Sequence, residues 1–163
     1  MDHTQIKETL NCIEYIDLGL SVKWANCNLG AKTPEETGER FSFEEKSKVD
    51  YVKLPTKEQC EELINNCTWK WHGGKNKGVY VIGKNGNKIF LPAVGELYYD
   101  EQMQAEGEAG SYWSSSLQGT DGKYAYYISY CYKFDFLKMK YTMSKGVYFT
   151  NVNLRNLVIR SVE

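Results

Sequence analysis

The chain has 163 residues, which is enough for one complete hydrophobic core and short for two domains. Its 20 basic and 21 acidic side chains nearly cancel, which argues against a nucleic-acid-binding protein that depends on a strong positive field. No apolar run approaches the roughly 20 residues needed to span a bilayer. We therefore expect no nucleic-acid partner and no direct membrane insertion by this chain.

The N-terminal region is predicted to be a polar arm over residues 1–13. The first ten residues, Met1–Leu10, lack the apolar stretch of a secretory signal. Two interpretations stay open on this evidence: a cytoplasmic protein, or a segment of a longer exported protein.

The first half of the chain shows short strand patterns and one weak helix signal. Residues 14–17 and 21–25 are strand candidates separated by a turn at Gly19. Thr33 before Pro34, followed by two acidic residues and then Gly38, predicts a helix of one or two turns over residues 32–38. An extended segment then follows over residues 41–43.

The main helix is predicted to start at Thr56. Thr56 and Gln59 have the spacing of a capping box, in which each side chain binds the backbone of the other residue. Apolar residues then recur at helical spacing and form one stripe. The stripe comprises Cys60, Leu63, Ile64 and Cys67.

The rest of the chain is predicted to be rich in strands. Asn85-Gly86 between apolar segments is the strongest short signal for a β-hairpin. Residues 95–110 look like a long irregular excursion. The later strands are expected at residues 111–115, 123–132, 136–141, 146–150 and 157–162. This order predicts the α+β class, with the helices segregated from the sheet.

The cysteines and histidines do not have the spacing of a metal site. The five cysteines are an odd number, so at least one cannot pair within the chain, and we leave their pairing open. None of the gaps is that of a zinc knuckle, and His72, five residues after Cys67, has only His3 as a possible second histidine. We therefore expect no metal and no cofactor. The cysteines are Cys12, Cys27, Cys60, Cys67 and Cys131.

Several short motifs occur in a fixed order along residues 14–162. They are Trp24-Ala25, Asn28-Leu29-Gly30, Leu54-Pro55-Thr56, Cys67-x-Trp69, Gly86-Asn87 with Phe90-Leu91-Pro92-Ala93 and Gly95, Tyr112-Trp113-Ser114-Ser115-Ser116, and Ile159-Arg160-Ser161-Val162. In this order they resemble the major paralogous domain family first named from Fibrobacter succinogenes.

The resemblance implies a fold and a setting. The expected fold is a single C-type-lectin-like domain over residues 14–163, with one main helix and a short helix packed on short twisted antiparallel strands, and with the first and last strands side by side. Related domains commonly belong to secreted or surface-anchored bacterial proteins, lipoproteins included, so the resemblance implies an extracellular or cell-surface location. Trp113 is expected to be a buried structural anchor.

The favoured functional hypothesis is a non-catalytic module that binds a protein or carbohydrate ligand outside the cell. The chain has thirteen tyrosines, and tyrosine with small polar neighbours is typical of contact surfaces. Strand alternation places Tyr126, Ile128 and Tyr130 on an inward face and Tyr127 and Ser129 on an outward one, where Tyr127 is expected to be half exposed. The predicted ligand-binding residues on that outward face are Tyr127, Ser129, Lys138 and Lys140.

Two alternatives remain open from the sequence. The first is a divergent oxidoreductase of the sulfatase-modifying type that uses Cys131. The second is a purely structural module of a surface assembly. We expect no enzymatic activity, because the serines of 114–116 lack the G-x-S-x-G context of a nucleophile and the chain has only two histidines to act as a base.

Overall fold

The computed structural model describes residues 13–47, 49, 51–98 and 102–163. The predicted arm of residues 1–13, including His3 and Cys12, lies outside the described residues except for Ile13. Two helices and twelve strands make up the described chain. In order they are β1 (Tyr15–Ile16), β2 (Trp24–Ala25), β3 (Arg40–Phe41), α2 (Phe43–Ser47), α3 (Lys57–Asn66), β4 (Thr68–His72), β5 (Gly78–Ile82), β6 (Lys88–Pro92), β7 (Glu96–Tyr98), β8 (Met103–Gln104), β9 (Ala109–Gln118), β10 (Tyr124–Asp135), β11 (Lys140–Asn151) and β12 (Arg155–Val158).

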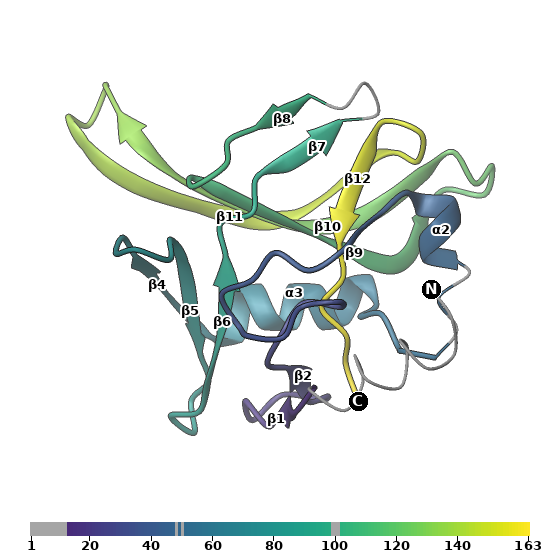
Figure 1. Cartoon of the computed structure of the whole chain (residues 1–163), viewed down its shortest axis with the longest axis horizontal. Helices are drawn as coiled ribbons and strands as arrows, with labels where there is room; N and C mark the ends of the chain where they lie inside the picture. Colours follow the sequence, from purple (N-terminus) through teal and green to yellow (C-terminus); the bar gives the residue numbers. More distant parts are fainter. Residues whose placement is uncertain (1–12, 48, 50, 99–101) are drawn as a thin grey trace.

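The largest element is a curled sheet in the order β11-β10-β9-β12-β7-β8, with β3 pairing on β12. Strands β9, β10 and β11 form an antiparallel meander, and β12 lies parallel to β9. The pair β10–β11 keeps one register over its full length, from Tyr124↔Asn151 to Asp135↔Lys140. In Figure 1 this pair sweeps across the top of the molecule and ends in a projecting hairpin.

One face of the curled sheet is covered by α3 and by a smaller sheet, β4-β5-β6. Asn85 and Gly86 form the turn between β5 and β6, as predicted, and Gly86 has a φ of 86°, which suits glycine. Ile128 and Tyr130 of β10 lie on this face, where they pack in one core cluster with Leu63 of α3.

Helix α3 begins as the sequence predicts. The Thr56 hydroxyl accepts from the Gln59 amide at 3.2 Å, and the Gln59 side chain accepts from the Thr56 amide at 2.9 Å. Cys60 and Leu63 of the predicted stripe are fully buried. The capping box and the apolar stripe are therefore confirmed.

The opposite face carries a second core cluster around Trp113. Trp113 has no exposed surface, and its indole Nε1 donates to the carbonyl oxygen of Phe41 at 2.8 Å. Leu157 and Ile159 of the C-terminal segment pack in the same cluster. The prediction that Trp113 is buried is confirmed.

The C-terminal segment runs beside β2. Trp24 and Val162 form an antiparallel bridge, and the Lys23 amide donates to the Glu163 carbonyl at 3.1 Å. The first strand, β1, pairs with β2, and the last strand, β12, pairs with β3, β7 and β9. The two ends of the described chain thus meet through β2 and the residues that follow β12.

The expected α+β, C-type-lectin-like fold is wrong. Of the described residues, 46% lie in strands and 10% in helices, and the sheet is one long curled surface of up to twelve-residue strands. The motifs each specify a local turn, cap or buried anchor, and they do not specify how many strands join or how long each one is. The number of strands and their lengths depend on pairing between segments far apart in the sequence.

Three local predictions are also wrong. Residues 32–38 form turns, because the Glu36 carboxylate accepts from the Lys32 amide at 2.7 Å and closes a local loop. The short helix lies instead at α2, which begins at Phe43, the last residue of the segment predicted to be extended. Residues 95–110 contain β7 and β8, and residues 136–139 connect β10 to β11 as a hairpin loop where a strand was expected.

Candidate functional site

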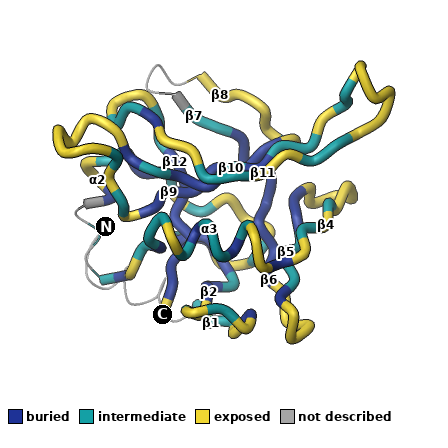
Figure 2. Tube along the Cα trace, turned by 180° about the vertical axis from the view of Figure 1, so that it is seen from behind, coloured by how far each residue is buried: buried dark blue, intermediate teal, exposed yellow. Residues whose placement is uncertain are grey.

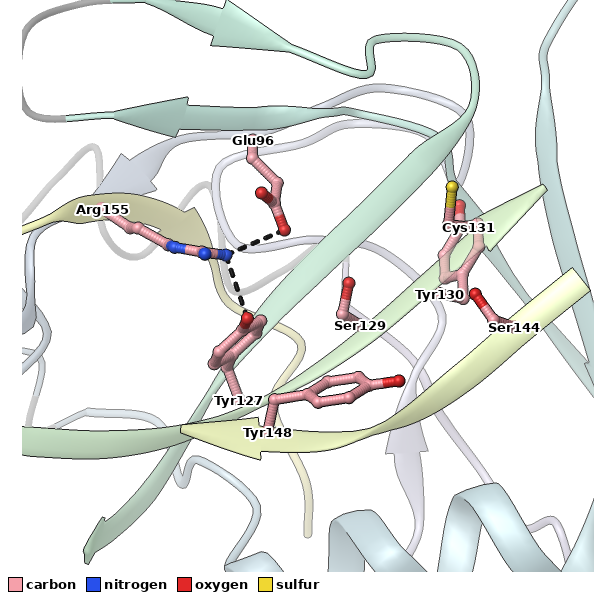
Figure 3. Close-up of a pocket in the computed structure, with 8 residues that line it drawn as sticks. All are labelled: Glu96, Tyr127, Ser129, Tyr130, Cys131, Ser144, Tyr148 and Arg155. Atoms are coloured by element: carbon pink, nitrogen blue, oxygen red, sulfur yellow. Dashed lines mark hydrogen bonds and ion pairs between the residues drawn. The ribbon is translucent and has the colours of Figure 1, made fainter. Parts of the chain in front are cut away.

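A pocket of about 220 Å³ opens on the sheet face opposite α3. We call it the tyrosine pocket. It is lined by Glu96, Tyr127, Ser129, Cys131, Ser144, Tyr148 and Arg155, and also by Tyr130, whose ring packs on the α3 face. These residues come from β7, β10, β11 and β12, so the curled sheet brings four strands together around one site (Figure 3).

The register of β10 and β11 explains why a pocket forms there. Tyr127, Ser129 and Cys131 lie opposite Tyr148, Gly146 and Ser144. Gly146 has no side chain at the middle of this row, which leaves space between the two tyrosines and the serines. A Cβ atom at Gly146 would lie 3.0 Å from the ring of Tyr148, so a larger residue would displace that ring.

An ion pair with hydroxyl partners forms the polar wall of the pocket. The Arg155 Nη1 donates at 3.0 Å to Glu96 Oε1 and at 3.0 Å to the Tyr127 hydroxyl oxygen (Figure 3). Ser111 donates to the same Glu96 oxygen at 2.7 Å and lies 3.0 Å from the Ser129 hydroxyl. A network of this kind holds its side chains in one geometry before any ligand arrives.

Aromatic rings form the other wall. The guanidinium of Arg155 lies 5.1 Å from the centre of the Tyr127 ring, within the range of a cation–π contact. The Tyr127 and Tyr148 rings lie 6.0 Å apart with a tilt of 41°. Tyr127 is 7% exposed and Tyr148 is 46% exposed, so Tyr148 presents the accessible ring.

Cys131 is the only thiol among the lining residues. Burial raises its pKa above the ordinary value, an effect that the nearby Lys133 opposes. A thiol used as a nucleophile needs the opposite shift, towards the thiolate at neutral pH. The lining residues also include no histidine to act as a base. The arrangement is suited to binding a polar ligand more than to acid–base or thiol chemistry.

The predicted site residues separate into two places. Tyr127 and Ser129 both line the tyrosine pocket, but Tyr127 is buried against Arg155 and Trp113 and is not half exposed as expected. Lys138 and Lys140 lie at the β10–β11 hairpin, away from the pocket lining, because residues 136–139 are a loop at the far end of the strands.

Sequence reasoning missed Glu96, Arg155 and Ser144. Glu96 and Arg155 are 59 positions apart, and only the antiparallel pairing of β7 with β12 brings them together. No local pattern marks that contact. Tyr148 had a signal, as one of the tyrosines of the late strands, but its face follows from the β10–β11 register.

The described residues contain no group of three or more histidine, cysteine, aspartate or glutamate side chains that could hold a metal ion. His72 packs its ring 5.6 Å from that of Tyr80 and 6.1 Å from that of Phe90, which is a structural role. Neither helix in the described part of the chain is long and apolar enough to cross a membrane.

No family model matches the chain, and neither a curated protein nor a solved structure is significantly similar to it. The resemblance to the major paralogous domain family therefore stays a prediction.

Proposed function

We propose that this chain is a non-catalytic binding module that holds a carbohydrate ligand in the tyrosine pocket. The observation that carries the proposal is the pairing of one accessible ring, that of Tyr148, with a preformed Glu96–Arg155–Tyr127 network in the same pocket. A sugar ring needs both kinds of surface, since its C–H face stacks on aromatic rings and its hydroxyl groups both donate and accept hydrogen bonds.

The two walls have complementary tasks in this proposal. The Tyr148 ring supplies apolar contact at small entropic cost, because a tyrosine side chain has few rotatable bonds. Ser129 and Ser144 supply adaptable hydroxyls, and the Glu96–Arg155 pair supplies a fixed acceptor and a fixed donor. The pair is mostly buried, at 16% and 18% side-chain exposure, so water screens it less than a surface pair.

The setting we propose is the outside of a bacterial cell, as a secreted or surface-anchored module that acts in adhesion or ligand capture. The support is the resemblance of the ordered motifs from Trp24 to Val162 to domains of such proteins.

The test is a matched pair of variants on adjacent residues of β11. Tyr148 lines the pocket, whereas Phe149, 53% exposed, points to the other face and contacts Tyr124 and Tyr126. Binding of the wild type is measured on a glycan array, and the affinity for the best ligand is then measured by calorimetry. We expect Tyr148→Ala to weaken binding about tenfold or more, since an aromatic contact and its buried area are both lost.

Phe149→Ala is expected to bind like the wild type. Thermal melts of both variants check that the fold is intact. Equal losses in the two variants, or a wild type that binds no glycan on the array, would refute the proposal.

A further inference from the structure

The hairpin that joins β10 and β11 ends in an apolar tip that contributes nothing to the core. We define the tip as residues 136–139, Phe136-Leu137-Lys138-Met139. Phe136, Leu137 and Met139 are 80%, 98% and 72% exposed, which makes them the three most exposed large apolar side chains of the described chain. Figure 2 shows this loop in yellow, projecting beyond the rest of the molecule.

The hairpin is built to hold the tip away from the body. The Asp135 side chain accepts from the amides of Leu137 and Lys138 at 3.0 and 3.2 Å and so fixes the turn. The last six residues of β10 remain paired with β11 up to Asp135↔Lys140. The tip is therefore an ordered projection.

A ladder of aromatic rings lines one side of the same hairpin. Neighbouring rings along it have centroids 4.5 to 5.4 Å apart, two of the contacts being nearly parallel stacks. The ladder runs from the body to the tip through Trp71, Tyr132, Tyr141, Phe134 and Phe136.

Positive charge surrounds the tip. Residues 133–141 hold three lysines and one carboxylate, although the whole chain has a net charge of −1. The carboxylate, Asp135, is already engaged by the two loop amides and lies 3.8 Å from Lys138 Nζ. The projection thus offers apolar side chains at its end and amino groups from Lys133, Lys138 and Lys140 just behind them.

We propose that this tip docks on an anionic lipid bilayer, with Phe136, Leu137 and Met139 inserted among the acyl chains and the lysines among the headgroups. The order of chemistry along the hairpin matches the order across a bilayer surface: apolar end first, then aromatic rings and cations at the interface. This departs from the sequence-based expectation of no membrane insertion, which rested on the lack of a spanning segment.

The shape of the projection favours a bilayer over a protein partner. A stable protein interface buries about 800 Å² on each side, and a tip two strands wide offers little flat surface. A fluid bilayer needs no complementary shape, and a few apolar side chains with nearby lysines give the reversible binding that is typical of peripheral proteins.

The experiment measures sedimentation of the protein with vesicles of phosphatidylcholine alone or mixed with phosphatidylglycerol. We expect binding to the mixed vesicles that weakens with added salt. Phe136→Ser with Leu137→Ser should lower the partition coefficient at least about tenfold, since each side chain then stays in water. Lys138→Ala with Lys140→Ala should lower it by about fivefold per lysine on mixed vesicles only.

The matched control is Leu154→Ser, a leucine that is 41% exposed in the turn between β11 and β12, and it should bind like the wild type. The tip side chains lie outside both core clusters, so all variants should keep the wild-type melting temperature. A wild type that ignores both vesicles, or tip variants that bind like the Leu154→Ser control, would overturn the proposal. It would also be overturned in favour of protein docking if the wild type ignores vesicles but self-associates in sedimentation velocity and the tip variants do not.

Discussion

Replacing Arg160 with methionine tests what holds the two ends of the domain together. Arg160 is 1% exposed, and its guanidinium donates to the Asn28 side chain at 2.9 Å, to the Ala25 carbonyl at 3.1 Å and to the Phe90 carbonyl at 2.8 Å. These acceptors belong to the N-terminal region and to β6, so one side chain of the C-terminal segment joins three parts of the chain. Methionine keeps much of the volume and removes every donor.

The expected cost follows from those three bonds. A hydrogen bond to a charged group contributes about 1.5–3 kcal/mol, and an abandoned buried acceptor costs about 1–3 kcal/mol. Against this stands the penalty of burying a guanidinium among neutral acceptors, which is several kcal/mol and which also lowers the pKa of Arg160. We expect the cost of the abandoned acceptors to outweigh the relief of that penalty, because Asn28 is itself fully buried and solvent does not reach it to take the place of the arginine. The net loss should be about 3–5 kcal/mol.

The assay is urea and thermal unfolding followed by circular dichroism. At roughly 2–4 °C per kcal/mol for a chain of this size, a loss of 3 kcal/mol lowers the melting temperature by about 6–12 °C. Lys53→Met removes one exposed charge from the segment that pairs with Val162, and it should change stability by less than about 0.5 kcal/mol. An Arg160→Met variant within 1 kcal/mol of the wild type would show that the desolvation penalty offsets the bonds, and the reasoning would fail.

Three further predictions concern the core and the titrating groups. Trp113→Ala should lower the free energy of unfolding by about 3–5 kcal/mol, because it empties a fully buried site and abandons the Phe41 carbonyl; an unchanged melting temperature would contradict this. Burial lowers the pKa of Lys46 to about 8 from 10.5, so the unfolded chain binds more protons between these values and Lys46 adds stability as the pH rises through that window. The stability of the wild type minus that of Lys46→Met should therefore rise by about 1–3 kcal/mol from pH 8 to 10.5. Taking this difference cancels the opposite effect of groups common to both proteins, such as Cys60, whose pKa burial raises to about 12. A difference that does not change with pH would contradict the prediction. Cys131 should be alkylated by iodoacetamide at pH 8 more slowly in the folded than in the unfolded chain, since burial raises its pKa; faster alkylation in the folded protein, measured by peptide mass spectrometry, would revive the thiol-enzyme alternative.

Local features of the fold were predictable where neighbouring residues determine them. The Thr56–Gln59 cap, the stripe with Cys60 and Leu63, and the turn at Gly86 each depend on contacts within a few positions, and all three are confirmed. The Thr33-Pro34 signature is local as well, but it is equally compatible with a turn and with the start of a helix. The carboxylate of Glu36 decides between them by closing the turn.

The sheet was not predictable in the same way, because its number of strands and their lengths depend on distant partners. Alternation along β10 correctly separates Ile128 from Tyr127. It does not reveal that both faces are covered near that point, one by α3 and the other by Leu29, Val52 and Phe43 of α2, which pack around Trp113. The expectation that Tyr127 is half exposed is wrong because alternation gives no information on what covers the outward face. The irregular register between Ala125 and Tyr127 is also invisible to a pattern of period two.

The tyrosine pocket and the hairpin tip share one strand, β10, and this sets how the two proposed activities relate. Ser129 and Phe136 are seven residues apart, which is about 23 Å along an extended strand. Sites at that distance with no shared partner are energetically independent as a rule, and the unbroken β10–β11 pairing gives neither site a second conformation through which to affect the other. Tip variants should thus leave the affinity of the pocket unchanged, and pocket variants should leave vesicle binding unchanged. The strand pair would then act as a fixed spacer that keeps the pocket outside the headgroup layer while the tip is docked, where a ligand from solution or from the same surface has access to Tyr148.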